Sequence, residues 1–430
     1  MKGKNEPMKL MRGVEFREAF GPGTVLPEYG GLGVANIVPT VERHFGVGSE
    51  WPALAEAVLP ARLLEGATCI VALLVDAFGY LQLVRAFEEG TAPRLAGLVE
   101  RGEAEGLVAH LAPITSTFPS TTVTALTTLG TGVPPGRHGV VTQVMHDAQL
   151  GATIDILPFA PMLAGVGLQT AGVSPEEWIG LPTAYERLRE RGVETIVVNH
   201  REFQNTSLSL INHRAARYRG FYTMSDLAVN LRHAIEHAPR PAYIHAYWGT
   251  LDSIAHAYGT GSAQHAAEVQ QLDHAIGELL LSGLRAPGTL VLLFADHGHI
   301  DCIPEPVVWY NDHPRLLDAL TSPPAGLDRA TVLYVRPGRV DEARGYLAAE
   351  LGHVFDVLTA EESIELGLYG PPPPTAVARD RTGQLLLLPR ENWIAKYQRP
   401  GWDRQATNIG KHGGLSTEEM LAPLLALRLG

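Results

Sequence analysis

Seven side chains of the kinds that bind metal ions or act as nucleophiles stand where apolar runs or turns end. They are three carboxylates, three imidazoles and one hydroxyl: Asp76, Asp252, Asp296, His256, His297, His412 and Thr122. Oxygen and imidazole donors in these proportions suit borderline cations such as Zn²⁺. Seven groups are more than one tetrahedral ion needs when a position stays open for a substrate. Two ions are therefore the simpler interpretation.

Several of these groups also have a purely structural interpretation. Asp296-His-Gly-His299 could be a polar turn, and Asp76 could cap the helix that follows it. Thr121 and Thr122 could be capping hydroxyls, and His412 could belong to a glycine turn. The remaining histidines that the sequence singles out are interpreted as structural, satisfied or exposed: His138, His146, His200, His245, His274 and His299.

Spacing along the chain supports a site over isolated turns. Asp252 and His256 are four residues apart, which places both on one face of a helical turn. Leu290 to Ala295 is apolar without alternation, as expected of a strand buried on both faces of a parallel sheet. Adjacent residues of a straight strand point to opposite faces. Asp296 and His297 can therefore share one ion only if a turn begins there, and Gly298 should supply the freedom for it.

The elements that must position these groups alternate along the chain. Strands are predicted over 69–75, 107–111, 194–198, 241–248 and 290–295, with helices over 80–87, 182–191, 227–237 and 266–281. This alternation predicts an α/β fold with a mostly parallel central sheet covered by helices on both faces. Such sheets carry their chemistry at the carboxyl ends of the strands. We expect one catalytic domain over 1–430, with a loose arm at 1–25 and a small inserted excursion or lid at 301–385.

Composition narrows the function classes. The chain has 430 residues, 45% of them hydrophobic and 19% charged, and a net charge of −12. Basic residues form no cluster beyond the first few positions, which argues against a grip on nucleic acid. Two cysteines, Cys69 and Cys302, are too few for a disulfide framework. The sequence contains neither a signal-peptide pattern nor a long apolar span, so a cytoplasmic protein without a membrane anchor is the expectation.

The order of these motifs resembles the alkaline phosphatase superfamily, and more narrowly its type I phosphodiesterase/nucleotide pyrophosphatase family. That family carries a Phe-Pro motif with a nucleophilic threonine, followed by Thr-Gly and His-Gly-Ile-Val-x-Asn. Here Phe118-Pro-Ser-Thr-Thr122 aligns without a gap to Thr131-Gly132 and to His138-Gly-Val-Val-Thr-Gln143. The resemblance runs from about Cys69 to His412 and implies an alkaline-phosphatase-like fold. It assigns the nucleophile to Thr122 and not to Thr117.

The resemblance also implies a division of the ligands between two divalent ions, most simply zinc, with manganese as the alternative. One ion would be held by Asp76, Thr122, Asp296 and His297, and the other by Asp252, His256 and His412. The first would lower the pKa of the Thr122 hydroxyl, and the second would stabilise the leaving oxygen. The expected partner is a small phosphate ester.

The sequence departs from the family pattern at three positions that bear on the substrate. Ala125 replaces an asparagine three residues past the nucleophile, and Val123 replaces an aromatic residue that could stack on a nucleobase. Gln143 replaces the second phosphate-binding asparagine and keeps an amide donor on a longer arm. These changes put nucleotide preference in doubt. An aromatic face could come instead from one of three other residues: Tyr247, Trp248 or Tyr258.

The favoured function is a metal-dependent phosphodiesterase or nucleotide pyrophosphatase that forms a phosphothreonine intermediate. Phosphomonoester hydrolysis, phosphonoacetate hydrolysis and a phosphomutase reaction are the alternatives on the same core. A non-catalytic metal-stabilised binding protein is the least favoured hypothesis, because such a protein has no need of Thr122.

Overall fold

A seven-stranded sheet forms the centre of the molecule. The computed structural model describes residues 14–105, 109–163, 165–302, 307–401, 403–404 and 408–430. The strand order is β2-β18-β9-β1-β8-β6-β7. Their bounds are β1 (Cys69–Val75), β2 (Ala109–Thr115), β6 (Glu194–His200), β7 (Arg217–Phe221), β8 (Ala242–Trp248), β9 (Thr289–Phe294) and β18 (Leu421–Leu429). β18 is antiparallel to both neighbours and the remaining pairs are parallel, which confirms the predicted mostly parallel sheet.

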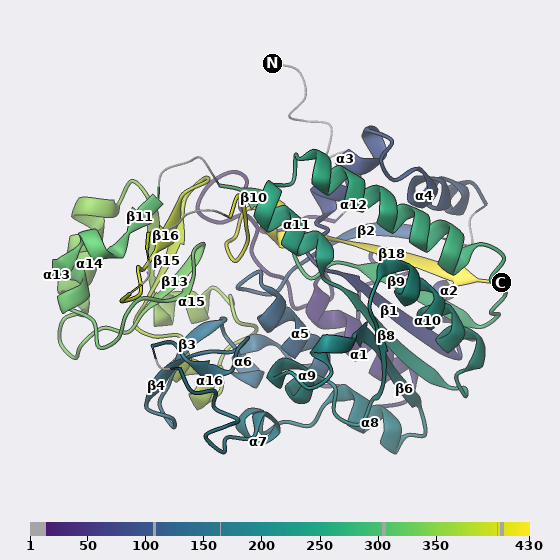
Figure 1. The fold of residues 1–430 in the computed structure, drawn as a ribbon, viewed down its shortest axis with the longest axis horizontal. Coiled ribbons are helices and arrows are strands. Elements are labelled where there is room, and N and C mark those ends of the chain that lie inside the picture. The colour runs from purple at the N-terminus through teal and green to yellow at the C-terminus, as the bar shows by residue number, and fades with distance from the viewer. Residues whose placement is uncertain (1–13, 106–108, 164, 303–306, 402, 405–407) are drawn as a thin grey trace.

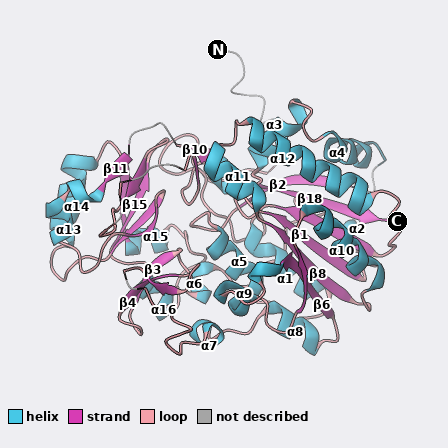
Figure 2. Cartoon of the chain, in the orientation of Figure 1, coloured by secondary structure: helices cyan, strands magenta, loops and turns pink. Residues whose placement is uncertain are grey.

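Helices cover both faces of this sheet (Figure 1 and Figure 2). One side carries α1 (Ile37–His44), α5 (Thr122–Thr131), α8 (Ala184–Glu190) and α9 (Ser207–Asn212). The other side carries α3 (Tyr80–Glu88), α4 (Pro93–Glu105), α10 (Met224–His237) and α12 (Ala263–His274). Every residue of β1 and β9 is buried. A strand covered on both faces has no solvent side, which explains the continuous apolar runs in the sequence.

Two elements differ from the sequence-based expectation. The single helix expected over 266–281 is α12 followed by a π-helical segment, Ala275–Leu281. The apolar segment 421–429, for which no strand was predicted, is β18, a largely buried strand that pairs with β9 and β2. An antiparallel strand inside a parallel sheet is set by tertiary pairing, and an apolar run alone does not reveal its direction.

A second, smaller sheet is formed by the chain between β9 and β18 and lies at the left of Figure 1. Its order is β12-β13-β15-β14, and all of its pairs are antiparallel. The strands are β12 (Ala325–Leu327), β13 (Ala330–Leu333), β14 (Phe355–Thr359) and β15 (Leu385–Pro389), with β11 (Val307–Trp309) and β16 (Ile394–Lys396) paired beside them. The helices here are α13 (Pro314–Asp318), α14 (Val340–Leu351), α15 (Ala360–Glu365) and α16 (Ala376–Arg381). The predicted excursion, 301–385, includes β12, β13 and β14 of this sheet, and β15 begins at its last residue.

A buried ion pair joins the small sheet to the central body. Arg329 donates from Nη2 to Oε2 of Glu419 at 2.8 Å and from Nε to Oε1 at 3.3 Å. Both side chains are at most 2% exposed. The same Glu419 carboxylate accepts the backbone N–H of Gly414 at 2.8 Å. This pair therefore fixes the backbone two residues after His412.

Shorter elements complete the described chain. A three-stranded sheet consists of β3 (Val144–Asp147), β4 (Ala152–Asp155) and β5 (Ala160–Pro161). The short helices are α2 (Ala61–Leu64), α6 (Pro135–His138), α7 (Pro175–Ile179) and α17 (Thr417–Met420). Of the arm expected over 1–25, residues 1–13 lie outside the described part. From residue 14 on, the arm lies against the body, with Val14 and Val25 buried and Thr24 bridged to Ser416. None of the helices that the described residues form combines the length and apolar character needed to cross a bilayer.

Candidate active site

The site is built where three adjacent parallel strands end. β1 lies between β8 and β9, so their carboxyl ends meet at one edge of the sheet. Asp76 directly follows β1, and Asp296 lies two residues past the end of β9. After β8 the chain enters α11 (Thr250–Tyr258), whose first and second turns carry Asp252 and His256. Topology alone therefore gathers groups that are more than 200 residues apart.

The Thr122 hydroxyl lies against the first group of candidate ligands. Its Oγ1 is 3.3 Å from each carboxylate oxygen of Asp76 and 3.2 Å from Nε2 of His297. His297 Nε2 also lies 3.5 Å from Oδ2 of Asp296. Ligand atoms of Asp76, Asp296 and His297 all lie within 4.8 Å of one another, in an arrangement that could hold one metal ion.

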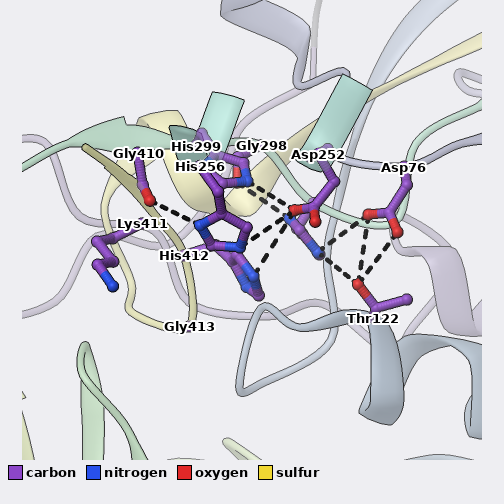
Figure 3. Close-up of polar contacts among 12 residues, drawn as sticks. Asp76, Thr122, Asp252, His256, Gly298, His299, Gly410, Lys411, His412 and Gly413 are labelled. Carbon is purple, nitrogen blue, oxygen red and sulfur yellow. Dashed lines mark hydrogen bonds and ion pairs between the residues drawn. The ribbon is translucent and has the colours of Figure 1, made fainter. Parts of the chain in front are cut away.

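A second group lies beside the first (Figure 3). It contains the three residues that the sequence grouped together, Asp252, His256 and His412, and their ligand atoms also lie within 4.8 Å of one another. Oδ1 of Asp252 is 3.5 Å from Nε2 of His256 and 3.8 Å from Nε2 of His412. His412 follows β17 (Gly410–Lys411), which pairs with β10 (Ile300–Asp301) just after β9. The structure thus brings all seven sequence-predicted groups into two adjoining clusters.

Backbone carbonyl oxygens accept hydrogen bonds from Nδ1 of three imidazoles and so fix which ring nitrogen carries the hydrogen. Nδ1 of His256 lies 2.8 Å from the Gly410 carbonyl oxygen, and Nδ1 of His412 lies 2.8 Å from that of Ser120. Nδ1 of His297 lies 3.1 Å from the Gly298 carbonyl oxygen. A carbonyl oxygen only accepts, so each Nδ1 must carry the hydrogen, and the lone pair of the neutral form of the ring then lies on Nε2. This is the orientation that metal-binding imidazoles adopt in proteins.

His299, which the sequence analysis interpreted as structural or exposed, is the fourth member of the second cluster. It is 1% exposed, and its Nε2 lies 2.8 Å from Oδ1 of Asp252. The oxygen of an ionised carboxylate only accepts, so this Nε2 carries the hydrogen and donates it. Unlike its three neighbours, His299 therefore orients Asp252 in the observed arrangement. The available signal was its spacing from His297, because residues two apart in an extended segment point to the same side.

The electrostatics of the site favour a bound cation. Burial raises the pKa of Asp76 well above its ordinary range, and the nearby carboxylates of Asp296 and Asp252 raise it further. Burial also raises the pKa of Asp296 to about 7, and its buried Oδ2 has no hydrogen-bond partner among the described residues. Burial lowers the pKa of His256 to about 4 and that of His412 well below its ordinary value. Buried, mutually repelling carboxylates beside neutral imidazoles are the donor set that a divalent cation satisfies.

Asp252 differs from the other two carboxylates. Burial acts to raise its pKa, but the hydrogen bond from His299 and the electrostatic interaction with the surrounding imidazoles outweigh this effect and hold the pKa below its ordinary value. Asp252 is therefore ionised across the neutral range. The charge is available to a cation in the second cluster without a prior loss of a proton.

Close packing of two turns holds Asp76 and Asp296 together. Ala77 adopts a left-handed φ of 61°, and its N–H donates to Oδ1 of Asp296 at 3.2 Å. A Cβ on Gly79 would come within 2.7 Å of the Gly298 Cα. A Cβ on Gly298 would overlap the Glu418 carbonyl oxygen. Gly298 is not in the left-handed region, so it is needed for space and not, as the sequence suggested, for conformational freedom.

The amide of Gln143 faces a polar cavity of about 330 Å³ beside the second cluster. Its Nε2 donates one of its two hydrogens to Oδ1 of Asp155 at 3.2 Å, and the other remains available to a ligand. His256, Lys411 and His412 line the same cavity. Lys411 Nζ is paired with Asp328 Oδ2 at 2.7 Å.

Comparison with known proteins agrees with the geometry. The model of the type I phosphodiesterase/nucleotide pyrophosphatase family matches residues 70–415. The chain belongs to this family. The matched range includes every candidate ligand and Thr122. Comparison with curated protein sequences finds no match.

Solved structures of two kinds of hydrolase share the fold of this chain. Murine ectonucleotide pyrophosphatase/phosphodiesterase 5 superposes with a TM-score of 0.62 at 18% identity, over 83% of this chain and 87% of the murine one. Phosphonoacetate hydrolase from Sinorhizobium meliloti, in complex with phosphonoformate, gives a TM-score of 0.61 at 18% identity, over 85% and 91%. An inactive form of the murine protein in complex with AMP gives 0.61 at 17% identity, over 83% and 87%. These likenesses confirm the alkaline-phosphatase-like α/β fold.

The buried carboxylates predict how stability depends on pH when metal is removed. Asp296 has a pKa of about 7 in the folded chain and about 3.9 in an unfolded one, so between these values the native state binds more protons. Its contribution to stability is present at low pH and is lost as pH rises through about 7. In EDTA, the denaturant midpoint should fall between about pH 4 and pH 7 and level off above that range.

Asp296→Asn is the matched control for this titration, because it removes the group and keeps its shape. In EDTA the midpoint of the variant should gain on that of the native protein as pH rises. Zn²⁺ should stabilise the native protein more than the variant at pH 8. Parallel pH profiles of the two proteins in EDTA would contradict the assignment.

Proposed function

We propose that the protein is a metal-dependent phosphodiesterase or nucleotide pyrophosphatase that transfers the phosphoryl group through Thr122. The position of the Thr122 hydroxyl carries the proposal: it lies within 3.3 Å of Asp76 and 3.2 Å of His297, where an otherwise weak nucleophile could be activated. The family match over residues 70–415 supports the same class of reaction. The substrate would be a small phosphate ester.

Two divalent cations fit the residues. Asp76, Thr122, Asp296 and His297 would hold one, and Asp252, His256 and His412 would hold the other, with His299 fixing the orientation of Asp252. Mixed oxygen and imidazole donors favour Zn²⁺, with Mn²⁺ as the alternative. Bound ions would lower the pKa of the Thr122 hydroxyl and offset negative charge on the phosphoryl and leaving oxygens.

The start of α5 binds the phosphoryl oxygens in this proposal. Thr122 is the first residue of that helix, and the Thr121 side chain makes no capping hydrogen bond. The first backbone N–H groups of a helix have no partner within it, and they point towards an anion placed at its end. The nucleophile and these donors therefore face the same phosphate group.

The reaction proceeds in two displacements at phosphorus. Thr122 loses its hydroxyl proton to solvent, its Oγ1 forms a bond to phosphorus, and the bond from phosphorus to the leaving oxygen breaks. The leaving group takes up a proton from water. A water molecule then attacks phosphorus, the bond to Oγ1 breaks, and Thr122 regains a proton. Charge is conserved through both steps, and no redox partner is needed.

Hydrolysis of a phosphonate such as phosphonoacetate is the second candidate. The observation that favours it is the polar cavity beside His256 and His412, which is also lined by Lys411 and Arg399. Cationic side chains at that position could face a carboxylate on the leaving side. In the structure, Lys411 is paired with Asp328 and Arg399 lies 3.9 Å from Asp155, so their charge is largely offset. The diesterase proposal is therefore preferred.

The choice of ester tests the reaction class. With Zn²⁺ or Mn²⁺ present, bis-p-nitrophenyl phosphate should be hydrolysed with a higher kcat/KM than p-nitrophenyl phosphate. The physical reason is a second cavity beside Thr122, whose described lining residues include no Asp, Glu, Lys or Arg. It can accept a second ester group but has no cationic side chain to bind the additional negative charge of a monoester. Preference for the monoester would overturn the diesterase proposal, and phosphate release from phosphonoacetate alone would favour the second candidate.

Thr122→Ala tests the nucleophile. The variant should lose turnover by at least about a thousandfold, because water would have to replace a positioned hydroxyl, while elemental analysis should still find bound metal. Thr121→Ala is the matched control: it removes the adjacent hydroxyl, which makes no capping bond, and should leave most of the activity. Undiminished hydrolysis by Thr122→Ala would exclude the phosphothreonine route.

A further inference from the structure

Two cavities adjoin the site, and the larger one lies beside the second cluster. This polar cavity, of about 330 Å³, is lined by His256, Lys411 and His412 and by residues of the small sheet and its surroundings. The other, here called the apolar cavity, measures about 190 Å³ and is lined by Thr122 and Leu126, among others. Sites for small molecules have volumes of roughly 300–1,000 Å³. The polar cavity can therefore hold a substrate group of its own.

The geometry of displacement assigns the polar cavity to one side of the phosphorus. In an in-line reaction, the leaving oxygen departs on the side opposite the attacking oxygen. Figure 3 shows Thr122 at one end of the two clusters and Lys411 at the other. The described lining of the polar cavity includes His256 and His412 of the second cluster but not Thr122. The cavity therefore lies on the side of the leaving group.

The charged side chains of the polar cavity balance one another. Its described lining includes two carboxylates, Asp155 and Asp328, and two cations, Arg399 and Lys411. Lys411 Nζ lies 2.7 Å from Oδ2 of Asp328, and Arg399 Nη2 lies 3.9 Å from Oδ2 of Asp155. An anionic leaving group would have to compete with the carboxylates for the cations, and a cationic one with the cations for the carboxylates. An uncharged polar group meets neither penalty.

The wall of this cavity contains a buried hydroxyl that is open to a ligand. Tyr310, in the turn Tyr310–Asp312, is 1% exposed and lines the cavity. No described residue lies at hydrogen-bonding geometry to its hydroxyl. Burial raises the pKa of Tyr310, so the hydroxyl keeps its hydrogen at neutral pH and can donate it. A buried polar atom left unpaired costs on the order of 1–3 kcal/mol, so this donor calls for a partner.

The Asp328 carboxylate keeps acceptor positions for a ligand. Lys411 Nζ and Lys396 Nζ lie 2.7 Å and 3.6 Å from its Oδ2. An ionised carboxylate has about four acceptor positions on its two oxygens, so two lysine contacts do not fill them. A hydroxyl group both donates and accepts. Two hydroxyls of one molecule can therefore pair with this carboxylate and with the Tyr310 phenol together.

We infer that the polar cavity is a subsite for an uncharged polyol leaving group, such as a glyceryl group or a sugar. One hydroxyl of the polyol donates to the Asp328 carboxylate, and another accepts from the Tyr310 hydroxyl. The bond between phosphorus and the polyol oxygen breaks, and the released alcohol takes up a proton from water. This inference rests on the proposed hydrolysis of phosphodiesters, and it favours esters over pyrophosphates as substrates.

The test uses phenylphosphonate monoesters and the metal-loaded protein. Each ester carries one negative charge, as a phosphodiester does, and its phenyl group cannot leave, so the ester group is the only leaving group. Glyceryl, propyl and p-nitrophenyl esters are compared, and each kcat/KM is divided by the rate of hydroxide-catalysed hydrolysis to correct for leaving ability. The propyl ester lacks both hydroxyls. Its corrected kcat/KM should be about 10- to 100-fold lower than that of the glyceryl ester.

Tyr310→Phe should lower the glyceryl-to-propyl ratio by about tenfold. The variant removes one hydrogen bond to the polyol, whereas the propyl ester has none to lose. Because the hydroxyl has no described partner, the variant should melt at or above the native temperature. Tyr346→Phe, on α14, is the matched control. Its hydroxyl lies 2.9 Å from Nδ1 of His313 and outside the described lining of the cavity, so the ratio should stay native.

Asp328→Asn tests the exclusion of anionic leaving groups. Phenylphosphonyl phosphate has phosphate as its leaving group, and the variant leaves Lys411 without its carboxylate partner. The kcat/KM for this anhydride, relative to that for the p-nitrophenyl ester, should rise by about tenfold over the native ratio. Asp356→Asn, on β14, is the matched control. It removes a carboxylate paired with Arg390, neither of which is in the described lining, and should leave the ratio as in the native protein.

The outcomes separate the two proposals. If the native protein hydrolyses none of the esters with either metal, including the p-nitrophenyl ester, the proposed function fails. If it hydrolyses the p-nitrophenyl ester but shows no corrected preference for the glyceryl over the propyl ester, the inference alone is overturned. An unchanged glyceryl-to-propyl ratio in Tyr310→Phe, or an unchanged anhydride ratio in Asp328→Asn, would also overturn the inference.

Discussion

The site depends on one constraint: two carboxylates are buried in contact with each other at the ends of neighbouring strands. The hydrogen-bond partners of Asp76 are the hydroxyls of Thr122 and Tyr247, and those of Asp296 include the N–H groups of Ala77 and His297. Such partners reduce the cost of the buried charge without cancelling it. A divalent cation held by these side chains would offset it. The structure around the carboxylates then makes sense as a means of keeping them together, through the left-handed Ala77 and the contact of Gly79 with Gly298.

The central sheet and the identity of the clustered groups could be predicted because both leave local signatures. A strand buried on both faces has a continuous apolar run, and a carboxylate at its end is conspicuous for that reason. The order of the motifs along the chain then grouped Asp76, Asp296 and His297 as candidate ligands of one ion. The position of His299 in the site was not predicted, because a histidine near a site is equally compatible with a metal ligand, a hydrogen-bond donor or a structural residue. Its contact with Asp252 and its place in the second cluster become visible only in the structure.

Features that depend on tertiary approach could not be predicted from the sequence. The apolar cavity exists because α9 packs against α5 where Gly130 leaves room for Asn212, and neither helix signals this contact by itself. The direction of β18 depends on its pairing with β2 and β9 in the same way. The role of Gly298 was predicted for the wrong reason, since a glycine required for space and one required for a positive φ look alike in sequence. The contact of Gln143 with Asp155 depends on the approach of β4, and the phosphate-binding role of Gln143 stays a prediction.

The two cavities make the two sides of the site chemically different, which the candidate catalytic groups alone do not do. On the side of His256 and His412, charged residues of both signs line a polar space beside the small sheet. On the side of Thr122, the walls are apolar and uncharged. The family fixes the chemistry at phosphorus, whereas segments outside the shared motifs, including 155–157, 199–213 and 324–331, form the walls. Substrate choice can therefore differ between relatives whose reacting groups are alike.

Metal stoichiometry and position test the central claim most directly. Crystals of the zinc-loaded protein, measured at wavelengths on either side of the zinc absorption edge, should show two anomalous peaks per chain. One should lie among Asp76, Asp296 and His297, and the other among Asp252, His256 and His412, roughly 4 Å from the first. A single peak in fully loaded, active crystals, or peaks away from these side chains, would contradict the account.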